Sequence, residues 1–462
     1  MTSPTLAEAG ASPGKRPSRD AKVALVLLLL TYTVNFIDRM IINILGQPIK
    51  LDLGLSDAQL GLLGGFSFAL LYTVAAIPIA RMAERRSRVN IISVSIILWS
   101  LASGACGFAG TFGHLLLLRI AVGVGEAGSG PASHSLVSDY YPPEKRSGAL
   151  SVYALGMPLG IMLGAIMGGW LAENLSWRYA FFLLGFPGIL LGVIVKLLLR
   201  EPERGHSERT ANTAAPLQSA PPPLLQVARL MLAKRAFVQT MIGMALVSCA
   251  NSGIAAFLAP YLSRQFALPY TTIGLVSGLV MGVGSGVGTL LFGLMGDRLA
   301  AKDRRWLSWL PAVTQMLAGA TMAAAFLMPD WRIAAALLGL GFFLMAAHLG
   351  PSLAVTHNVV EPRMRATAIA LLFFIINLIG QGGGPLFVGL ISDTVFSRQL
   401  APGLNAASCA NPSGLAESAR TACLQASAMG SRVALVIISG LFLWGAIHYF
   451  LAARRIREDL IC

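Results

Sequence analysis

The sequence predicts an all-α membrane protein whose twelve transmembrane helices form two pseudo-symmetric six-helix bundles. Hydrophobic residues make up 55% of the 462 residues and charged residues only 12%, about half the charged share of an average soluble protein. Apolar runs of roughly 20 residues, the length that crosses the ~30 Å hydrocarbon layer as a helix, recur along the whole chain. Charged motifs of the first half return in the second half, which indicates duplication.

The apolar runs place the spans in chain order. A single buried core of a soluble protein would not need so many runs of this length. The predicted spans are 22–47, 58–80, 89–110, 113–140, 147–172, 177–199, 236–262, 271–295, 306–328, 331–358, 366–394 and 432–453.

Polar stretches divide the chain into units. The predicted units are a disordered cytoplasmic tail at 1–21, an N-terminal bundle at 22–199, a cytoplasmic linker at 200–230, a C-terminal bundle at 231–453 and a cytoplasmic tail at 454–462. The linker is indicated by its charges and by a run of three prolines. A signal peptide is the alternative for the first apolar run, but no small-residue cleavage pattern follows it before Asp38.

The net charge of +14 does not indicate a nucleic-acid-binding protein, because the basic residues lie in short segments between apolar runs. Most of the 35 lysines and arginines fall on the side of the two termini, and the positive-inside rule places such segments in the cytoplasm. We therefore expect a multi-pass protein of the plasma (cell inner) membrane with both termini cytoplasmic. We expect a monomer surrounded by membrane lipids.

A charged motif follows the second span and returns after the eighth. The first copy holds Glu84, Arg85 and Arg88, and the second holds Asp297 and Arg298. A small residue before the acid lets helices approach, and the acid can pair with an arginine or a helix end, so we predict a cytoplasmic gate latch. A second echo, after the fourth and tenth spans, matches Pro143 and Arg146 with Pro362 and Arg365.

Glycine recurs at every fourth residue in two spans. The two series are Gly156, Gly160, Gly164 and Gly168 in the fifth span and Gly274, Gly278, Gly282 and Gly286 in the eighth. Each series marks one smooth helix face that permits close approach of a neighbouring helix. Such faces serve either moving helices or static close packing.

Four charged residues lie deep inside predicted spans, away from their ends: Asp38 and Arg39 in the first span, and Arg119 and Glu126 in the fourth. A charge at mid-bilayer costs roughly 2.5–3.5 kcal/mol on insertion scales, so such residues normally face a wet cavity and have partners. At 1.5 Å per residue the two pairs overlap in depth. Pairing Asp38 with Arg119 and Glu126 with Arg39 is the simplest neutralisation, although other pairings fit the depths.

Polar residues extend these positions into two helix faces that predict one cavity. Asn35 and Asn43 share a face with Arg39, and Ser129 shares a face with Glu126. Further predicted cavity residues are Tyr72, Tyr153, Asn251, His348 and Asn377. For His348, packing between helices is an equally good explanation. The C-terminal half carries no comparable charge within its spans, so we infer coupling in one half and substrate selection largely in the other.

The buried acids predict proton coupling. Burial raises the proton affinity of a carboxylate and a nearby arginine lowers it, so movement of the arginine switches that affinity. Asp38 and Glu126 are the predicted proton-coupling residues, and Arg39 and Arg119 are their charge partners. A permanent ion pair that only fixes the two helices is the alternative. No cofactor is expected beyond the proton gradient.

The cysteines suggest no metal site. Cys106 and Cys249 lie in apolar spans, and Cys462 ends the chain. Cys409 and Cys423 share the long loop between the last two spans, where an oxidising compartment would allow them to pair. The sequence leaves open whether they are bonded.

Two parallel six-helix halves with a charged motif between the second and third spans resemble the major facilitator superfamily, over about 20–455. The resemblance implies halves that rock around a midplane site, with the fifth and eighth spans facing each other through their glycine faces. Ala80, Glu84 and Ser87 stand where the family motif has glycine, aspartate and glycine. These departures predict a looser or differently spaced latch.

Within the superfamily, the N-terminal half resembles the spinster-like transporters. The residues that carry this are Asn35, Phe36, Asp38 and Arg39, Gly61 to Leu63, Trp99 and Ser100, Arg119, Gly123, Gly125, Glu126 and Ala127, and the stretches SDYYPPEKR, WRYAF and EPERG that begin at Ser138, Trp177 and Glu201. The resemblance implies alternating-access movement of sphingosine 1-phosphate, other sphingoid lipids or lysophospholipids, often with proton coupling. Arg39 and Arg119 would then contact the head group.

Other functions fit less of the sequence. A drug or small organic anion transporter of the same fold would use the same arginines with a smaller cavity. A membrane sensor that does not transport is less favoured, because the gate motifs and the cavity charges are both present. A membrane enzyme is not indicated, because no nucleophile with a base, and no set of metal ligands, clusters at one membrane surface; we predict no catalytic residues.

Overall fold

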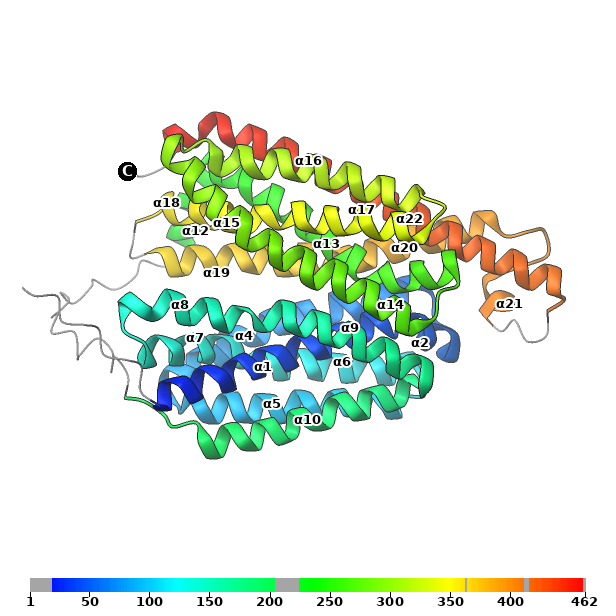
Figure 1. The fold of residues 1–462 in the computed structure, drawn as a ribbon, viewed down its shortest axis with the longest axis horizontal. Coiled ribbons are helices and arrows are strands. Elements are labelled where there is room, and N and C mark those ends of the chain that lie inside the picture. The colour runs from blue at the N-terminus through cyan, green and yellow to red at the C-terminus, as the bar shows by residue number, and fades with distance from the viewer. Residues whose placement is uncertain (1–18, 204–223, 362–363, 411–414, 460–462) are drawn as a thin grey trace, which may run out of the picture.

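The computed structural model describes residues 19–203, 224–361, 364–410 and 415–459. Most of the first predicted tail, most of the predicted linker and Pro362 lie outside these residues; residues 19–21 of the tail begin the first helix. The described residues form helices and contain no strand. Figure 1 shows the two halves as separate layers, with the helices up to residue 198 in one and those from residue 224 in the other.

The N-terminal half contains the first six spans. Its elements are α1 (Arg19–Ile44), α2 (Gly46–Leu53), α3 (Asp57–Gly61), the π-helical segment η1 (Leu62–Phe66), α4 (Ser67–Arg85), α5 (Arg88–Ala105), the 3-10 turn η2 (Cys106–Phe108), α6 (Phe112–Glu126), α7 (Ser129–Tyr140), α8 (Pro143–Ala154), α9 (Gly156–Asn174) and α10 (Trp177–Leu198).

The C-terminal half contains the other six. Its elements are α12 (Leu224–Ala233), α13 (Arg235–Phe266), α14 (Tyr270–Ser277), the π-helical segment η3 (Gly278–Val283), α15 (Gly284–Lys302), α16 (Trp306–Leu327), α17 (Trp331–Met345), the 3-10 turn η4 (Ala346–His348), α18 (Leu349–Asn358), α19 (Arg365–Ile375), the π-helical segment η6 (Ile376–Gln381), α20 (Gly382–Gln399), α21 (Ala406–Ala410) and α22 (Glu417–Asp459).

The predicted spans are confirmed, with one difference in the fourth. Eleven helical stretches are long and apolar enough to cross a membrane, and the remaining span is α6 followed by α7, interrupted at Ala127 and Gly128. Glycine allows this chain segment to lie against α5. A Cβ on Gly125 would lie 2.9 Å from the amide nitrogen of Trp99, and one on Gly128 would lie 2.4 Å from Ser95 Oγ.

The two halves repeat each other in detail, as the sequence echoes predicted. Arg146 donates a hydrogen bond to the carbonyl of Ser138 at 2.9 Å, and Arg365 donates one to the carbonyl of His357 at 3.1 Å. Arg365 follows Arg146 by 219 positions, and His357 follows Ser138 by the same number. Both arginines therefore bind carbonyls near the end of the helix that precedes them, in the fourth and tenth spans.

We call the two ends of the molecule the tail end, where α1 begins and α22 ends, and the hairpin end, where a disulfide joins Cys409 in α21 to Cys423 in α22. The 43 residues of α22 span about 65 Å at 1.5 Å per residue, more than a bilayer needs. Figure 1 shows α21 and the start of α22 projecting beyond the other helices at the hairpin end.

The halves meet along the fifth and eighth spans, as expected, but only one glycine series lies at this interface. A Cβ on Gly274 would lie 2.3 Å from the carbonyl oxygen of Ala165, and one on Gly282 would lie 3.0 Å from Met162 Cβ. The series of the fifth span faces α1 instead, where a Cβ on Gly160 would lie 2.4 Å from the carbonyl oxygen of Thr33. The expected contact between the two glycine series is therefore wrong, and the glycine of α9 that meets Gly274 is Gly169, which is not in the series. The face of α9 that meets α14 and η3 includes Pro158, Met162, Ala165 and Gly169.

Candidate functional site

Four charged side chains from α1 and α6 form two ion pairs inside the N-terminal half. Arg39 Nε donates to Glu126 Oε2 at 2.8 Å, and Arg119 Nη1 lies 3.6 Å from Asp38 Oδ2. The cross pairing expected from helix depth is confirmed. Glu126 is fully enclosed, with 0% of its side chain exposed, whereas 24% of the Arg39 side chain is exposed. Arg39 is therefore the accessible member of the cluster.

Several polar atoms of this cluster have no hydrogen-bond partner among the described residues. They are Asp38 Oδ2, Glu126 Oε1, and Nε and Nη1 of Arg119. Asp38 Oδ1 accepts a hydrogen bond from Ser103 on α5. A buried polar atom without a partner costs about 1–3 kcal/mol, so each acid keeps an oxygen that would gain from a proton, a water or a polar ligand.

Aromatic rings surround the accessible arginine. The Arg39 guanidinium carbon lies 4.6 Å from the ring centroid of Phe68, 5.1 Å from that of Tyr72 and 5.2 Å from that of Phe36. The faces of aromatic rings attract a cation at such distances. One carboxylate and three aromatic rings therefore stabilise the Arg39 guanidinium, while part of the side chain stays exposed.

Of the predicted cavity residues in the N-terminal half, Tyr72 is placed at the charged cluster. Tyr153 stacks on Tyr32 with ring centroids 4.6 Å apart, and Tyr32 packs edge-on against Phe36 at 5.0 Å. Tyr153 thus extends the aromatic group. Ser129 instead hydrogen-bonds the carbonyl of Glu126 at 3.2 Å, across the break between α6 and α7.

The remaining predicted cavity residues make less specific contacts. Asn35 is buried in α1, and Asn43 is half-buried with its Oδ1 3.5 Å from a Cβ built on Gly64. Asn251 in α13 and Asn377 in η6 are half-buried. His348 Nδ1 lies 2.7 Å from the carbonyl oxygen of Met345, the last residue of α17. This local contact agrees with a packing role for His348.

Sequence reasoning missed the residues that complete the site from neighbouring helices. Ser103 binds Asp38, and Tyr32 carries the aromatic group further along α1. Helical spacing could have indicated both aromatic residues. Phe36 lies three positions before Arg39 and Tyr32 lies four positions before Phe36, and residues at these spacings share one helix face. Ser103 carried no such signal, because one serine in an apolar run is ordinary.

At the tail end, the predicted gate motif acts within the N-terminal half. Arg88 is buried, donates to Glu201 at 2.7 Å and to Ser135 at 2.9 Å, and pairs with Asp139 at the end of α7. Arg85, Asp297 and Arg298 are exposed, and nothing is described of the Glu84 side chain. The described residues of the two motif copies therefore do not latch one half to the other; Arg88 fastens α5 to α7 and to the chain after α10.

Glu201 is the acid at the centre of this tail-end group. Besides Arg88, Ser87 Oγ donates to it at 2.8 Å and the amide of Val89 at 2.9 Å. Partial burial by itself would raise the pKa of Glu201, but the hydrogen bonds from Val89, Arg88 and Ser87 outweigh it and lower that pKa below its ordinary value. The sequence placed Glu201 in the linker and gave it no task.

The disulfide that the sequence left open is present. Cys409 and Cys423 are bonded, with their Cα atoms 5.6 Å apart. Cys106 is buried and Cys249 is half-buried, and neither is bonded to another of the described cysteines.

Comparison with known proteins places this architecture in a family. The model of the Major Facilitator Superfamily matches residues 28–409. An MFS-type efflux pump of Mycolicibacterium smegmatis is 31% identical over 446 residues, which cover 96% of this chain and 95% of the pump. The sphingosine-1-phosphate transporter SPNS2 of Mus musculus is 25% identical over 389 residues, which cover 80% of this chain and 69% of that transporter.

A solved structure agrees with this chain throughout. It is a bacterial homologue of the human lysosomal transporter Spinster, in an inward-facing and unoccupied conformation, with a TM-score of 0.87 and 33% sequence identity. The match covers 97% of this chain and 100% of the homologue. The chain therefore belongs to the Major Facilitator Superfamily, as a spinster-like transporter rather than an enzyme.

Proposed function

We propose that this chain is a proton-coupled, alternating-access transporter of amphipathic lipids, with sphingosine 1-phosphate, other sphingoid lipids and lysophospholipids as its substrate class. The observation that carries the proposal is the buried cluster of two acids and two arginines between α1 and α6, in which each acid has an oxygen without a hydrogen-bond partner in the described part of the chain. The resemblance to spinster-like proteins supports the substrate class.

The proposed orientation has the tail end in the cytoplasm of a cell whose plasma membrane holds the protein. Two independent observations support it. Basic residues concentrate between spans at the tail end, as the positive-inside rule requires of cytoplasmic segments. The Cys409–Cys423 disulfide lies at the hairpin end, and disulfides persist in oxidising compartments outside the cytoplasm.

The conformation supports alternating access in an inward-facing state. Contacts between the halves concentrate toward the hairpin end, where α9 packs on α14 and η3, α3 packs on α20, and α2 packs on α13. With the hairpin end outside, the outer side is the closed one. A rocking motion that exchanges these contacts for others at the tail end would expose a midplane site to the outside.

Proton coupling would operate through the pairing of Glu126 with Arg39. A proton on Glu126 removes the negative charge that holds the guanidinium, and Arg39 is then free to bind an anionic head group beside the aromatic rings. Loss of the proton restores the ion pair and expels the head group from Arg39. The Asp38–Arg119 pair would respond in the same way, with Ser103 as a fixed hydrogen-bond donor to Asp38.

The coupling role is tested by Asp38→Asn and Glu126→Gln in proteoliposomes. Each change keeps the shape of the side chain and removes its titration. We expect both variants to lose lysophospholipid uptake driven by a pH gradient while exchange without a gradient persists. Asp52→Asn is the matched control, since Asp52 pairs with Arg178 at the hairpin end. Wild-type pH dependence in both cavity variants would refute the coupling role.

A drug or small organic anion transporter is the second candidate, favoured by the efflux pump that matches 96% of the chain. Parallel uptake assays with lysophospholipids and with organic anions separate the two, because a smaller cavity would accept only the anions. Binding of lipid without flux in sealed vesicles would instead indicate a sensor.

A further inference from the structure

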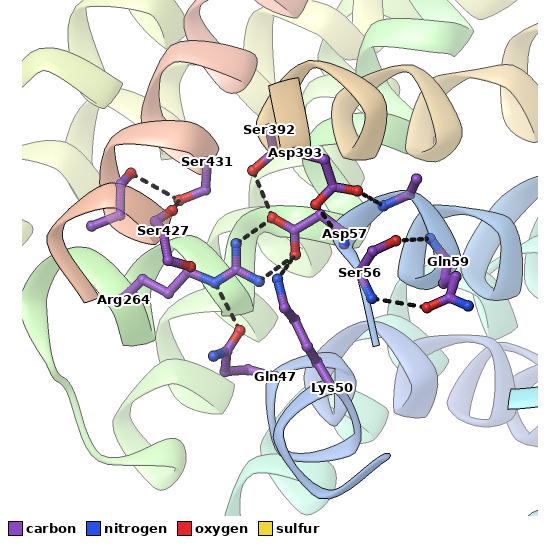
Figure 2. A network of polar contacts seen from close by, with 12 residues as sticks. Gln47, Lys50, Ser56, Asp57, Gln59, Arg264, Ser392, Asp393, Ser427 and Ser431 are labelled. Carbon is purple, nitrogen blue, oxygen red and sulfur yellow. Dashed lines mark hydrogen bonds and ion pairs between the residues drawn. The ribbon is translucent and has the colours of Figure 1, made fainter. Parts of the chain in front are cut away.

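The proposed function requires Glu126 to exchange a proton with water, although 0% of its side chain is exposed. Polar contacts between the halves close the hairpin end. Both terminal nitrogens of Arg264 in α13 donate to Asp57 in α3 at 2.7 Å, and Ser392 Oγ of α20 donates to Asp57 at 2.6 Å. Figure 2 shows Lys50 donating to the same carboxylate, at 2.5 Å. In this conformation a proton must therefore reach Glu126 from the tail end.

On that side, one histidine lies on the same helix face as Glu126. Glu126, Gly130 and His134 follow one another at intervals of four residues, which places them on one face. The break between α6 and α7 keeps this face, because Ala127 and Gly128 both have right-handed helical backbone angles. At 1.5 Å per residue, His134 lies about 12 Å nearer the tail end than Glu126. It is exposed, so its imidazole can exchange protons with water.

The hydroxyl of Tyr72 lies between these two residues. A Cβ on Gly130, the middle position of the face, would lie 3.9 Å from Tyr72 Oη. The ring centroid of Tyr72 lies 5.1 Å from the guanidinium carbon of Arg39, which in turn binds Glu126. Tyr72 therefore connects the middle of the face with the ion pair. A phenol hydroxyl can both donate and accept a hydrogen bond, as a proton relay requires.

Aromatic packing fixes His134 beside this route. Its ring meets that of Tyr153 in α8 edge-on, with centroids 5.2 Å apart, and Tyr153 stacks on Tyr32 of α1 at 4.6 Å. Ser133, the preceding residue, is fully buried, and its hydroxyl has no hydrogen-bond partner among the described residues. A buried hydroxyl of this kind can bind an ordered water molecule. Polar groups thus continue inward from His134 rather than ending at it.

Histidine is suited to this position, because its ordinary pKa lets it take up and release a proton between about pH 5 and 8. The helices packed against α7 are α1, α4, α5 and α8. The titratable or charged groups that they place in this region are Tyr32, Arg39, Tyr72, Arg88, Arg146 and Tyr153. Each of the three arginines is bonded to an acid or to a carbonyl of the N-terminal half. These cations are therefore already neutralised or engaged, and the imidazole is left to titrate.

We infer that His134 is a proton-relay residue, which exchanges protons with water at the tail end and passes them through the Tyr72 hydroxyl to Glu126. The inference rests on the proposed function, because it supplies a route to the proposed proton-coupling acid. It goes further by assigning a task to two residues that belong to neither ion pair.

The step conserves charge and protons. A proton leaves an imidazole nitrogen of His134 for the Tyr72 hydroxyl, directly or through a water of the cavity, and the hydroxyl gives its own proton to Glu126. His134 becomes neutral, Tyr72 ends as it began, and Glu126 becomes a neutral acid that no longer holds Arg39. Water at the tail end then protonates His134 again.

The relay is tested with His134→Gln in proteoliposomes that have equal pH on both sides and a gradient of lysophospholipid. Glutamine keeps a polar side chain and does not titrate. A positioned acid–base group speeds proton transfer about 10²–10⁴-fold, and because cavity water replaces part of this, we expect the rate at saturating lipid to fall roughly 5- to 20-fold. The KM for lipid should stay as in wild type, because Arg39 is untouched.

Rescue by a small base separates proton transfer from packing. Imidazole in the buffer should restore most of the rate of His134→Gln, because it can carry protons to Tyr72, whereas the same concentration of a bulky buffer should not. Tyr72→Phe removes the hydroxyl and keeps the ring beside Arg39, so we expect a similar loss without rescue. His114→Gln is the matched control, since His114 is exposed in the first turn of α6 at the hairpin end; its rate should match wild type.

A wild-type rate in His134→Gln would overturn the relay, and so would a loss that imidazole does not restore. A wild-type rate in Tyr72→Phe would overturn the route through its hydroxyl. Failure of the proposed function gives a different result: wild type itself would move lipid without moving protons, as read by a pH-sensitive dye in vesicles without imidazole.

Discussion

The two members of the Arg39–Glu126 pair differ in their surroundings. Glu126 is sealed within the N-terminal half, whereas Arg39 has 24% of its side chain exposed and lies beside three aromatic rings. A proton must therefore reach an enclosed acid, while a head group can approach an accessible cation. The proposed roles, proton binding by Glu126 and head-group binding by Arg39, follow from this difference in exposure.

Arg39→Lys separates the charge of the cation from its shape. Lysine keeps the charge but lacks the planar fork that meets Glu126 while lying beside Phe68 and Tyr72. A cation beside an aromatic face gains about 0.5–2 kcal/mol, so we expect lipid transport at low substrate to fall roughly 2- to 30-fold. Concentration-dependent uptake should show the loss mainly in KM. A loss confined to kcat, with KM unchanged, would contradict a head-group role for Arg39.

Glu201, which lies outside the membrane spans, should make the stability of the fold depend on pH. Its pKa is lowered in the folded state, so its contribution to stability is complete above its ordinary pKa of about 4.3 and is lost as the pH falls through the folded value. We expect the melting temperature of wild type to fall on acidification below about pH 4. Glu201→Gln should lower it at pH 7 and flatten this acid limb, measured by thermal unfolding in detergent.

Asp297→Asn is the control for that measurement, because Asp297 is an exposed acid at the same end of the molecule. It should leave both the melting temperature and its acid limb as in wild type. An acid limb that survives unchanged in Glu201→Gln would contradict a contribution of the Glu201 contacts to stability.

At the scale of the helices, the two glycine series lie at different interfaces. Gly282 lies against α9 of the other half, whereas Gly160 lies against α1 of its own half. Gly282→Leu should therefore suppress transport with little loss of stability. Gly160→Leu should lower the melting temperature, because overpacking a filled interface costs about 1–3 kcal/mol. Uptake and thermal unfolding measured together on both variants check this, and a destabilised Gly282→Leu with normal transport would reverse the assignment.

The helices themselves were predictable, and their partners were less so. The length of the apolar runs predicted the spans, and the position of charged residues far from the span ends predicted the site. Both signals lie within a single chain segment and are therefore strong. The site residues predicted in this way are Asp38, Arg39, Arg119 and Glu126. A glycine series shows that a helix face is smooth but does not show which helix covers it. The break at Ala127 and Gly128 was missed because hydropathy continues across it.

The polar contacts between the halves at the hairpin end show the same limit. Lys50 in α2 and Asp57 at the start of α3 fall between the first two predicted spans, in a stretch that the sequence indicated only as a connection. Their partner Arg264 lies more than 200 positions away, in the other half. Only the folding of the two halves against each other brings such groups together, and no local pattern reports it.

For the whole molecule, the hairpin end gives a test of orientation. Arg420 is exposed and lies between the bonded cysteines Cys409 and Cys423. Trypsin added outside right-side-out vesicles should cut after Arg420, and the two fragments should separate on a gel only after reduction. Protection of this site until the vesicles are opened would place the hairpin end in the cytoplasm, while separation without reduction would mean that the cysteines are not bonded.

The central claim is that lipid movement and proton movement are one process. The most direct measurement follows both in the same proteoliposomes, with labelled lysophospholipid outside and a pH-sensitive dye inside. We predict that adding lipid to wild type moves protons across the membrane in step with lipid, and that Glu126→Gln abolishes the proton signal. Lipid flux in wild type without any accompanying proton movement would contradict the account.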